Sequence, residues 1–141
     1  MSGGFFDYKQ DSIRDIADAL EAIVKNNGRT RNELHESGVD EIGEWFSLSV
    51  DWLDPIKTFD RLIGCRGFES PDETRKWISE HNSEKAVDFS PATIREFKKA
   101  IRLLRKAAVY AQRIDWLLSG DDGEDSFHEC LEEELNALKK R

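Results

Sequence analysis

Residues 92–119 read ATIREFKKAIRLLRKAAVYAQRIDWLLS, a stretch without glycine or proline in which apolar residues recur every three or four positions. Ser90 and Pro91 precede it as a helix start, because proline suits the first turn of a helix. The apolar residues fall in two adjoining lines, Ile94, Phe97, Ile101, Leu104, Ala108 and Ala111, then Leu103, Ala107, Tyr110, Ile114, Leu117 and Leu118. So wide an apolar surface predicts one long central helix that packs on two sides.

The other side of this predicted helix is basic. It carries a row of six cations that we call the basic stripe, Arg95, Lys98, Lys99, Arg102, Arg105 and Lys106, and further along Arg113. Acidic faces occur near both ends of the chain, with Asp11, Asp15, Asp18 and Glu21 in one and Glu129, Glu132, Glu133 and Glu134 in the other. We therefore expect the basic stripe to meet carboxylates, either within the chain or on another protein.

Overall composition also favours carboxylates over phosphates as partners of the basic stripe. The net charge is −8 and the pI is near 4.9, whereas a domain that binds nucleic acid is expected to be basic. Nucleic-acid binding through the basic stripe is kept as an alternative. At 141 residues, with four tryptophans and 38% hydrophobic residues, the chain can bury the core of one domain.

Capping signals predict shorter helices on both sides of the long one. The first runs from Ser12 to Asn27 and Gly28, and the last begins at Ser126, where Glu129 completes a capping box. The remaining helix starts are Thr30, Asp54 and Ser70, and a further helical stretch carries Ile42, Trp45 and Phe46.

The fold class that follows is all-α, a single-domain bundle (residues 1–141) of five to seven helices organised around the long helix. Only a short turn separates the long helix from the last one, so the two are expected to form a C-terminal helical hairpin. Residues 29–88 read as a helical insert in this domain. No strand pattern of useful length and no internal repeat occurs.

Cysteine use and hydropathy indicate the compartment. Cys65 and Cys130 form no CxxC motif, so neither a disulfide framework nor a zinc ribbon is indicated. The N-terminus lacks the pattern of a secretory signal, and no segment approaches the roughly 18 apolar residues of a membrane-spanning helix. We expect a cytoplasmic protein that does not cross a membrane.

No residue spacing in the chain matches a catalytic, cofactor or metal signature. His128 and Cys130 lie two apart on a predicted helix and so point to different sides. The acids within residues 121–125 lack the alternation of a calcium loop and read as a turn. We expect no cofactor and no metal, and binding is favoured over enzymatic activity. A small hydrolase that uses carboxylates and His128 is the remaining enzyme alternative.

Three aromatic residues, Phe5, Phe6 and Tyr8, follow a pair of glycines before the first predicted helix. A cluster of large apolar side chains is usually buried or bound, because exposed patches of this kind mark interaction sites. The favoured interpretation is that the rings pack across the bundle as a hydrophobic latch. The alternative is an exposed docking motif.

Two segments carry a resemblance to a known family. They are SGGFFDYKQ at residues 2–10 and YAQRIDWLLSGDDGEDSFH at residues 110–128, together with the stretch from residue 89 that leads into the second. The chain resembles a family of small uncharacterised bacterial proteins that are also expected in phages and mobile elements. That family has no established activity, so the resemblance implies a bacterial or phage setting and no catalytic or binding residues.

These features favour a non-catalytic protein-interaction module, an inhibitor or adaptor that acts on a nucleic-acid-handling partner in a bacterial or phage system. The candidate partner-binding residues are the basic stripe and the three N-terminal aromatics. If the opposite charges match between two copies of the chain, a homodimer results. Direct nucleic-acid binding is the second hypothesis and the small hydrolase is the third.

Overall fold

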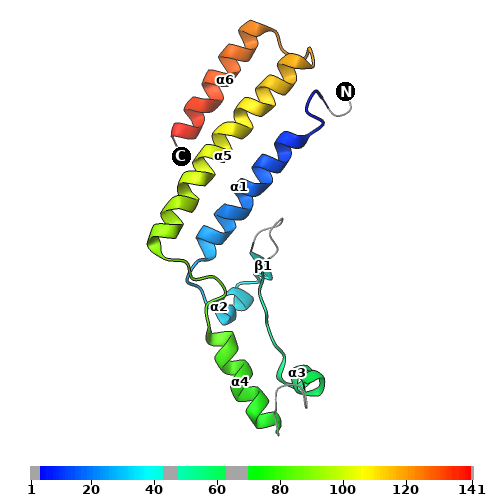
Figure 1. Cartoon of the computed structure of the whole chain (residues 1–141), viewed down its shortest axis with the longest axis vertical. Helices are drawn as coiled ribbons and strands as arrows, with labels where there is room; N and C mark the ends of the chain where they lie inside the picture. Colours follow the sequence, from blue (N-terminus) through cyan, green and yellow to red (C-terminus); the bar gives the residue numbers. More distant parts are fainter. Residues whose placement is uncertain (1–3, 43–47, 63–69, 141) are drawn as a thin grey trace. The chain divides into compact units, whose positions relative to one another are not determined.

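Helices dominate the structure, a computed structural model that describes residues 4–42, 48–62 and 70–140. Six helices account for 71% of the described residues, beside one sheet of two short strands (Figure 1). The predicted all-α class is thus confirmed. The chain divides into two compact units, one made of Met1–Glu21 with Pro91–Arg141 and the other of Ala22–Ser90.

The first unit is built on α5 (Pro91–Leu118), the predicted long helix with its bounds shifted by one residue. α1 (Lys9–Asn26), which belongs to this unit as far as Glu21, and α6 (Glu124–Lys139) run beside it (Figure 1). α6 packs on α5, so the predicted C-terminal hairpin is confirmed. Gly120 in the connecting turn has a φ of +81°, a left-handed conformation that glycine adopts without steric cost.

Two helices begin earlier than predicted. α1 begins at Lys9 instead of Ser12, and α6 begins at Glu124 instead of Ser126. The hydroxyl of Ser126 does not cap α6 but donates to the carbonyl of Gly123 at 3.3 Å, within the first turn. A serine can bond inside the first turn as well as cap it, so residue type alone does not fix where a helix starts.

The backbone that leads into α1 is held by a buried carboxylate of α5. Asp115 is 3% exposed, and its Oδ1 accepts a hydrogen bond from the amide of Phe6 at 2.7 Å. Its Oδ2 accepts one from Gln10 Nε2 at 3.4 Å, and the amide of Phe5 donates to Ser119 Oγ at 2.9 Å. The two bonds to the Asp115 carboxylate are charge-assisted and therefore stronger than neutral ones. They bind the N-terminal turn to the C-terminal end of α5.

The aromatic rings of this turn are less buried than its backbone. Phe5 is 63% exposed and Tyr8 is 54% exposed, while Phe6 is half-buried. Asp7 and Tyr8 have φ values of 54° and 60°, a left-handed conformation that costs a residue with a side chain about 1–2 kcal/mol. The latch expected of the three aromatics is therefore made by backbone amides, and two of the three rings reach solvent.

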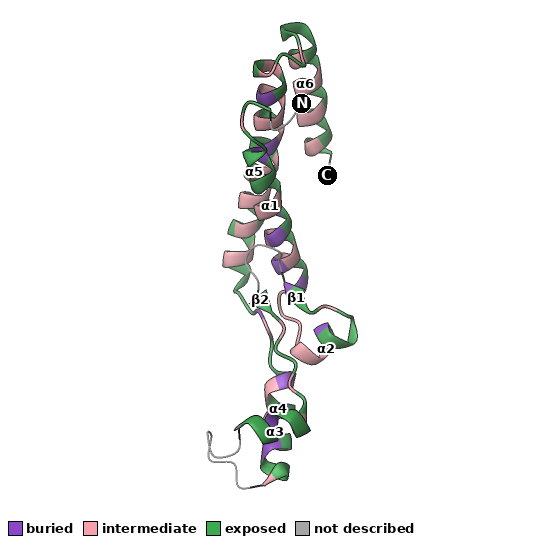
Figure 2. Cartoon of the chain, turned by 90° about the vertical axis from the view of Figure 1, so that its right-hand side faces the viewer, coloured by how far each residue is buried: buried purple, intermediate pink, exposed green. Residues whose placement is uncertain are grey.

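Apolar burial in the first unit is modest. Among the described residues of this unit, the buried hydrophobic ones are Ala17, Ala19 and Ala108. Most of α5 is half-buried or exposed (Figure 2), and on its second apolar line Leu103 is 68% and Leu118 is 52% exposed. The two apolar lines of α5 are thus covered only in part, so polar contacts have a large share in positioning α1 and α6.

The second unit holds three short helices and a two-stranded sheet. Its elements are α2 (Arg31–Glu36), β1 (Glu41–Ile42), β2 (Leu48–Ser49), α3 (Pro55–Leu62) and α4 (Pro71–Ser83). The three predicted caps are confirmed, since Thr30, Asp54 and Ser70 each accept a bond from a first-turn amide, at 3.2, 3.0 and 3.3 Å. α2 packs on α4, and Leu34 of α2 and Ile78 of α4 are buried.

The helix predicted around Ile42 is wrong. Glu41 and Ile42 form β1, which pairs antiparallel with β2, and Ile42 is fully buried. Gly38, with a φ of +76°, ends α2 and lets the chain leave in an extended direction. A short helix around Ile42 would be unstable by itself, whereas the pairing of β1 with β2 satisfies backbone N–H and C=O groups of both strands. Trp45 and Phe46, expected on the same helix, lie outside the described residues.

The substitution Gly4→Ala is expected to lower the free energy of unfolding by about 1–3 kcal/mol more than Gly120→Ala. Both glycines have a left-handed φ, +61° and +81°, so alanine strains both backbones. At Gly4 the added Cβ would also lie 2.4 Å from Asp115 Oδ2, while at Gly120 it meets nothing within 4 Å. Urea unfolding curves measure the difference. Equal losses would contradict the binding of the turn to Asp115.

Candidate partner-binding site

The basic stripe lies on α5 and includes cations that are already bound. Arg105 binds two carboxylates of α1, since its Nη2 lies 2.5 Å from Asp18 Oδ1 and 3.0 Å from Glu21 Oε2. Lys99 binds Glu96 of its own helix at 2.8 Å. The side chain of Arg105 is only 21% exposed, so this contact links α1 to α5 at a place that is partly removed from water.

The two carboxylates of α1 compensate the positive charge of Arg105 in its half-buried position. Burial works against the charge, but the hydrogen bonds and negative charges of Asp18 and Glu21 outweigh it and raise the pKa of Arg105 above its ordinary value. Arginine stays protonated in proteins in any case. The consequence is structural, because Nη2 of Arg105 binds carboxylates of α1 and so links the two helices.

Four other cations of the basic stripe form an exposed row, which we call the free strip. Arg95, Lys98, Arg102 and Lys106 are exposed and have no ion pair or hydrogen bond with any residue that the structure describes. Their spacing of three or four positions places them along one side of α5 over roughly 16 Å. The free strip is a continuous line of positive charge without a counter-charge in the described ranges.

Arg113 does not belong to this exposed row, although the sequence places it on the basic side of the helix. Its Nε donates to Glu134 Oε1 of α6 at 2.8 Å, and its Nη1 lies 3.4 Å from Asp122 Oδ2 in the turn. The guanidinium also lies over the ring of Trp116, 4.5 Å from its centroid. Arg113 is only 13% exposed because α6 packs on this part of α5.

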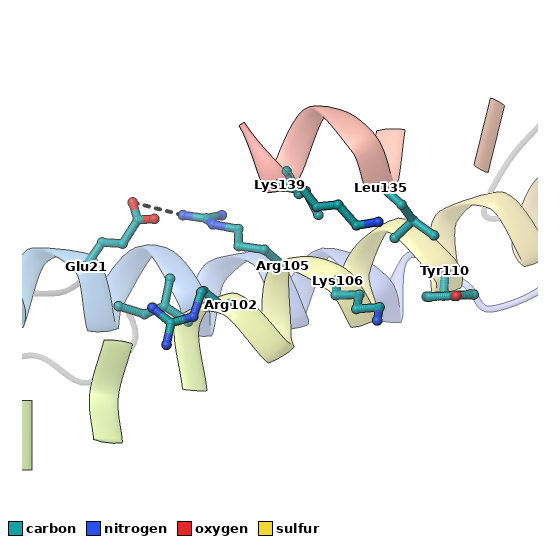
Figure 3. Close-up of a pocket in the computed structure, with 9 residues that line it drawn as sticks. Glu21, Arg102, Arg105, Lys106, Tyr110, Leu135 and Lys139 are labelled. Atoms are coloured by element: carbon teal, nitrogen blue, oxygen red, sulfur yellow. Dashed lines mark ion pairs between the residues drawn. The ribbon is translucent and has the colours of Figure 1, made fainter. Parts of the chain in front are cut away.

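A hollow of about 490 Å³ opens between α5, the end of α6 and Glu21 of α1 (Figure 3). Its apolar lining consists of Ile101 and Tyr110 from α5 and Leu135 and Leu138 from α6. The hairpin is antiparallel, so the last turns of α6 lie beside the half of α5 that carries the basic stripe. Apolar side chains from two helices are thereby brought next to the cations.

Basic side chains surround the apolar lining. Arg102, Arg105 and Lys106 extend from α5, and Lys139 comes from α6 (Figure 3). Among the described lining residues Glu21 is the only acid, and it is bound to Arg105. The hollow therefore has an excess of positive charge, and it can accept a group that combines apolar surface with negative charge.

The other candidate residues lie away from the free strip. Phe5, Phe6 and Tyr8 lie in the turn bound to the C-terminal end of α5, whereas the basic stripe runs from Arg95 to Lys106, from the first turns of that helix to its middle. Cys130 is half-buried with a free thiol, and the ring of His128 meets Phe127 edge-on at 5.1 Å. In the described ranges no group of three or more His, Cys, Asp or Glu could hold a metal ion.

Sequence reasoning alone does not find the hollow. In the sequence, Leu135 and Leu138 are simply the apolar side of the last helix, and Lys139 is one of several bases near the end. The feature of the sequence that could have indicated the hollow is the predicted C-terminal helical hairpin. Its antiparallel direction brings the end of the last helix back beside the basic stripe, so that apolar and basic groups meet.

Comparison with protein-family models, with curated proteins and with solved structures found no match. The resemblance to small bacterial and phage proteins remains a prediction. Within the described part of the chain, no helix has the length and apolarity that a membrane crossing needs.

Reversing the charge of Arg105 is expected to destabilise the protein, whereas reversing that of Arg102 is not. Arg105→Glu breaks two ion pairs and adds a third carboxylate beside Asp18 and Glu21, so we expect a loss of about 1–3 kcal/mol. Arg102→Glu is the matched control and should change stability by less than about 0.5 kcal/mol. Urea unfolding compares the two. Similar losses would show that the basic stripe does not divide into bound and free cations.

Proposed function

We propose that the protein is a non-catalytic interaction module that binds an acidic surface of another protein along the free strip. The observation that carries the proposal is a row of four exposed cations on one helix, without a counter-charge among the described residues. Opposite charge on a partner would steer its approach and fix its orientation. Each exposed pair contributes only about 0–1 kcal/mol, so the free strip selects the partner more than it strengthens binding.

Apolar side chains beside the free strip offer surface that a partner can bury, which exposed ion pairs alone do not provide. Leu103, the neighbour of Arg102 in the chain, is 68% exposed, and Tyr110 is 39% exposed. A few buried aromatic and apolar anchors usually dominate the energy of an interface, while charges around them give specificity. The expected partner surface is therefore acidic with an apolar centre.

Carboxylates close to the free strip disfavour nucleic acid as the partner. Asp18 and Glu21 of α1 bind Arg105, which lies on α5 between Arg102 and Lys106 of the free strip. A phosphate backbone that follows the strip would meet these negative charges as well as a net charge of −8. A folded protein surface can be shaped to avoid them. An inhibitor or adaptor works in this way, by occupying a surface, and a nucleic-acid-handling partner in a bacterial or phage system is part of the proposal.

The double variant Arg95→Glu, Lys98→Glu is expected to lose its protein partner, because it reverses half of the free strip. Lys57→Glu, Lys76→Glu is the matched control, with the same change of charge on exposed lysines of the second unit. Proteins that co-purify with the parent from its native host are identified, and binding is measured again with the purified partner. The dissociation constant should rise at least about tenfold for the strip variant and less than about twofold for the control.

Two other results would overturn the proposal. Labelled DNA and RNA are titrated in parallel at about 50 mM salt, where even non-specific contacts are favoured. Saturable micromolar binding that the strip variant abolishes would assign the surface to nucleic acid. Self-association of the parent that the same variant abolishes would assign the surface to a second copy of the chain.

A further inference from the structure

We propose that the hollow between α1, α5 and α6 binds a single-chain anionic amphiphile, a molecule with one apolar tail and one carboxylate or phosphate head. This inference goes beyond the protein contact proposed above and does not depend on it. The tail would lie on the apolar lining, and the head would meet the cations at the edge of the hollow (Figure 3).

The apolar lining offers room for a tail. Ile101 and Tyr110 of α5 and Leu135 and Leu138 of α6 line the same hollow, so an inserted chain would touch both helices. Its volume of about 490 Å³ lies within the roughly 300–1,000 Å³ that is usual for small-molecule sites. Each methylene group removed from water strengthens binding by up to about fourfold. Affinity is therefore expected to rise with tail length until the hollow is full.

The cations of the hollow that form no ion pair determine which head group the amphiphile must have. Arg102, Lys106 and Lys139 line the hollow and form no ion pair with any residue in the described ranges. Arg105 lines it too, but its guanidinium is engaged by two carboxylates of α1. Arginine offers planar donors that match two oxygens of a carboxylate or phosphate, and lysine adds a compact positive charge. The head group is thus anionic and contacts α5 and α6 together.

A ligand that is only anionic would leave the apolar lining uncovered, and a ligand that is only apolar would leave the cations without a counter-charge. An inorganic anion would match the cations but leave the leucine side chains in water. A neutral alkyl chain would cover the leucines but partly desolvate cations that have no counter-charge, which is unfavourable. An anionic amphiphile satisfies both, because its negative head and its tail are joined in one molecule.

The ligand class is tested by calorimetric titration of the whole protein, below the concentrations at which the ligands form micelles. The probes are decanoate, decyl phosphate, hexanoate, decanol, decyltrimethylammonium and inorganic phosphate. We expect decanoate or decyl phosphate to bind one per chain, and the better of the two identifies a carboxylate or phosphate head. Hexanoate, decanol and decyltrimethylammonium should bind at least about tenfold more weakly, and inorganic phosphate should not saturate.

Two charge-neutralising variants locate the site. Arg102→Gln, Lys106→Gln removes two of the head-group cations and should weaken the best ligand at least about tenfold. Arg95→Gln, Lys98→Gln makes the same change on the same helix outside the hollow and should alter its affinity less than about twofold. Circular dichroism is used to check that each variant remains helical. Because the control pair belongs to the free strip, a protein contact and an amphiphile site respond differently to it.

Three outcomes would overturn the inference. Equal weakening by the two variants would show general attraction to a basic helix and no site. Equal affinity for decanol would remove the role of the cations. Binding of many amphiphiles per chain with loss of helicity would show detergent action on the fold.

Discussion

Two arginines of α5, Arg105 and Arg113, determine how the first unit is assembled. Their side chains are 21% and 13% exposed, and each is matched by two carboxylates from outside α5. α1 supplies both partners of Arg105, while the turn and α6 supply those of Arg113. A cation removed from water without a counter-charge is costly, so these pairs fix which sides of α1 and α6 face α5. The buried hydrophobic residues of this unit are small alanines in the described ranges, and they specify orientation less strictly.

This assembly also decides which charges are left for other molecules. Asp18 and Glu21 of α1 bind Arg105 and Glu134 of α6 binds Arg113, while Arg95, Lys98, Arg102 and Lys106 remain exposed. The same arrangement brings leucines of α6 beside the middle of α5 and creates the hollow. An exposed line of charge favours a large acidic surface, and a hollow with an apolar lining favours a small amphiphile. The two proposals share Arg102, Lys106 and Tyr110, but they make separate claims.

Sequence patterns predicted the parts of the fold that local physics controls. The unbroken periodicity of residues 92–119 predicted α5, and the side chains of Thr30, Asp54 and Ser70 predicted three helix starts. Contacts between residues that are far apart in the sequence could not be predicted from it. Asp115 reads as an ordinary acid on a basic helix, and only the fold shows that it binds the amide of Phe6. Ile42 forms a strand because β2 pairs with it, a tertiary effect that overrides local propensity. The hollow needs the register of the hairpin, which no single segment encodes.

The division of the arginines of α5 into bound and exposed ones can be measured directly in the unaltered protein. Phenylglyoxal modifies accessible guanidinium groups, and peptide mass spectrometry reports the rate at each arginine. Arg95 and Arg102 are expected to react early, while Arg105 and Arg113 stay protected until urea unfolds the chain, after which all four react alike. Equal rates for Arg102 and Arg105 in the folded protein would contradict the account.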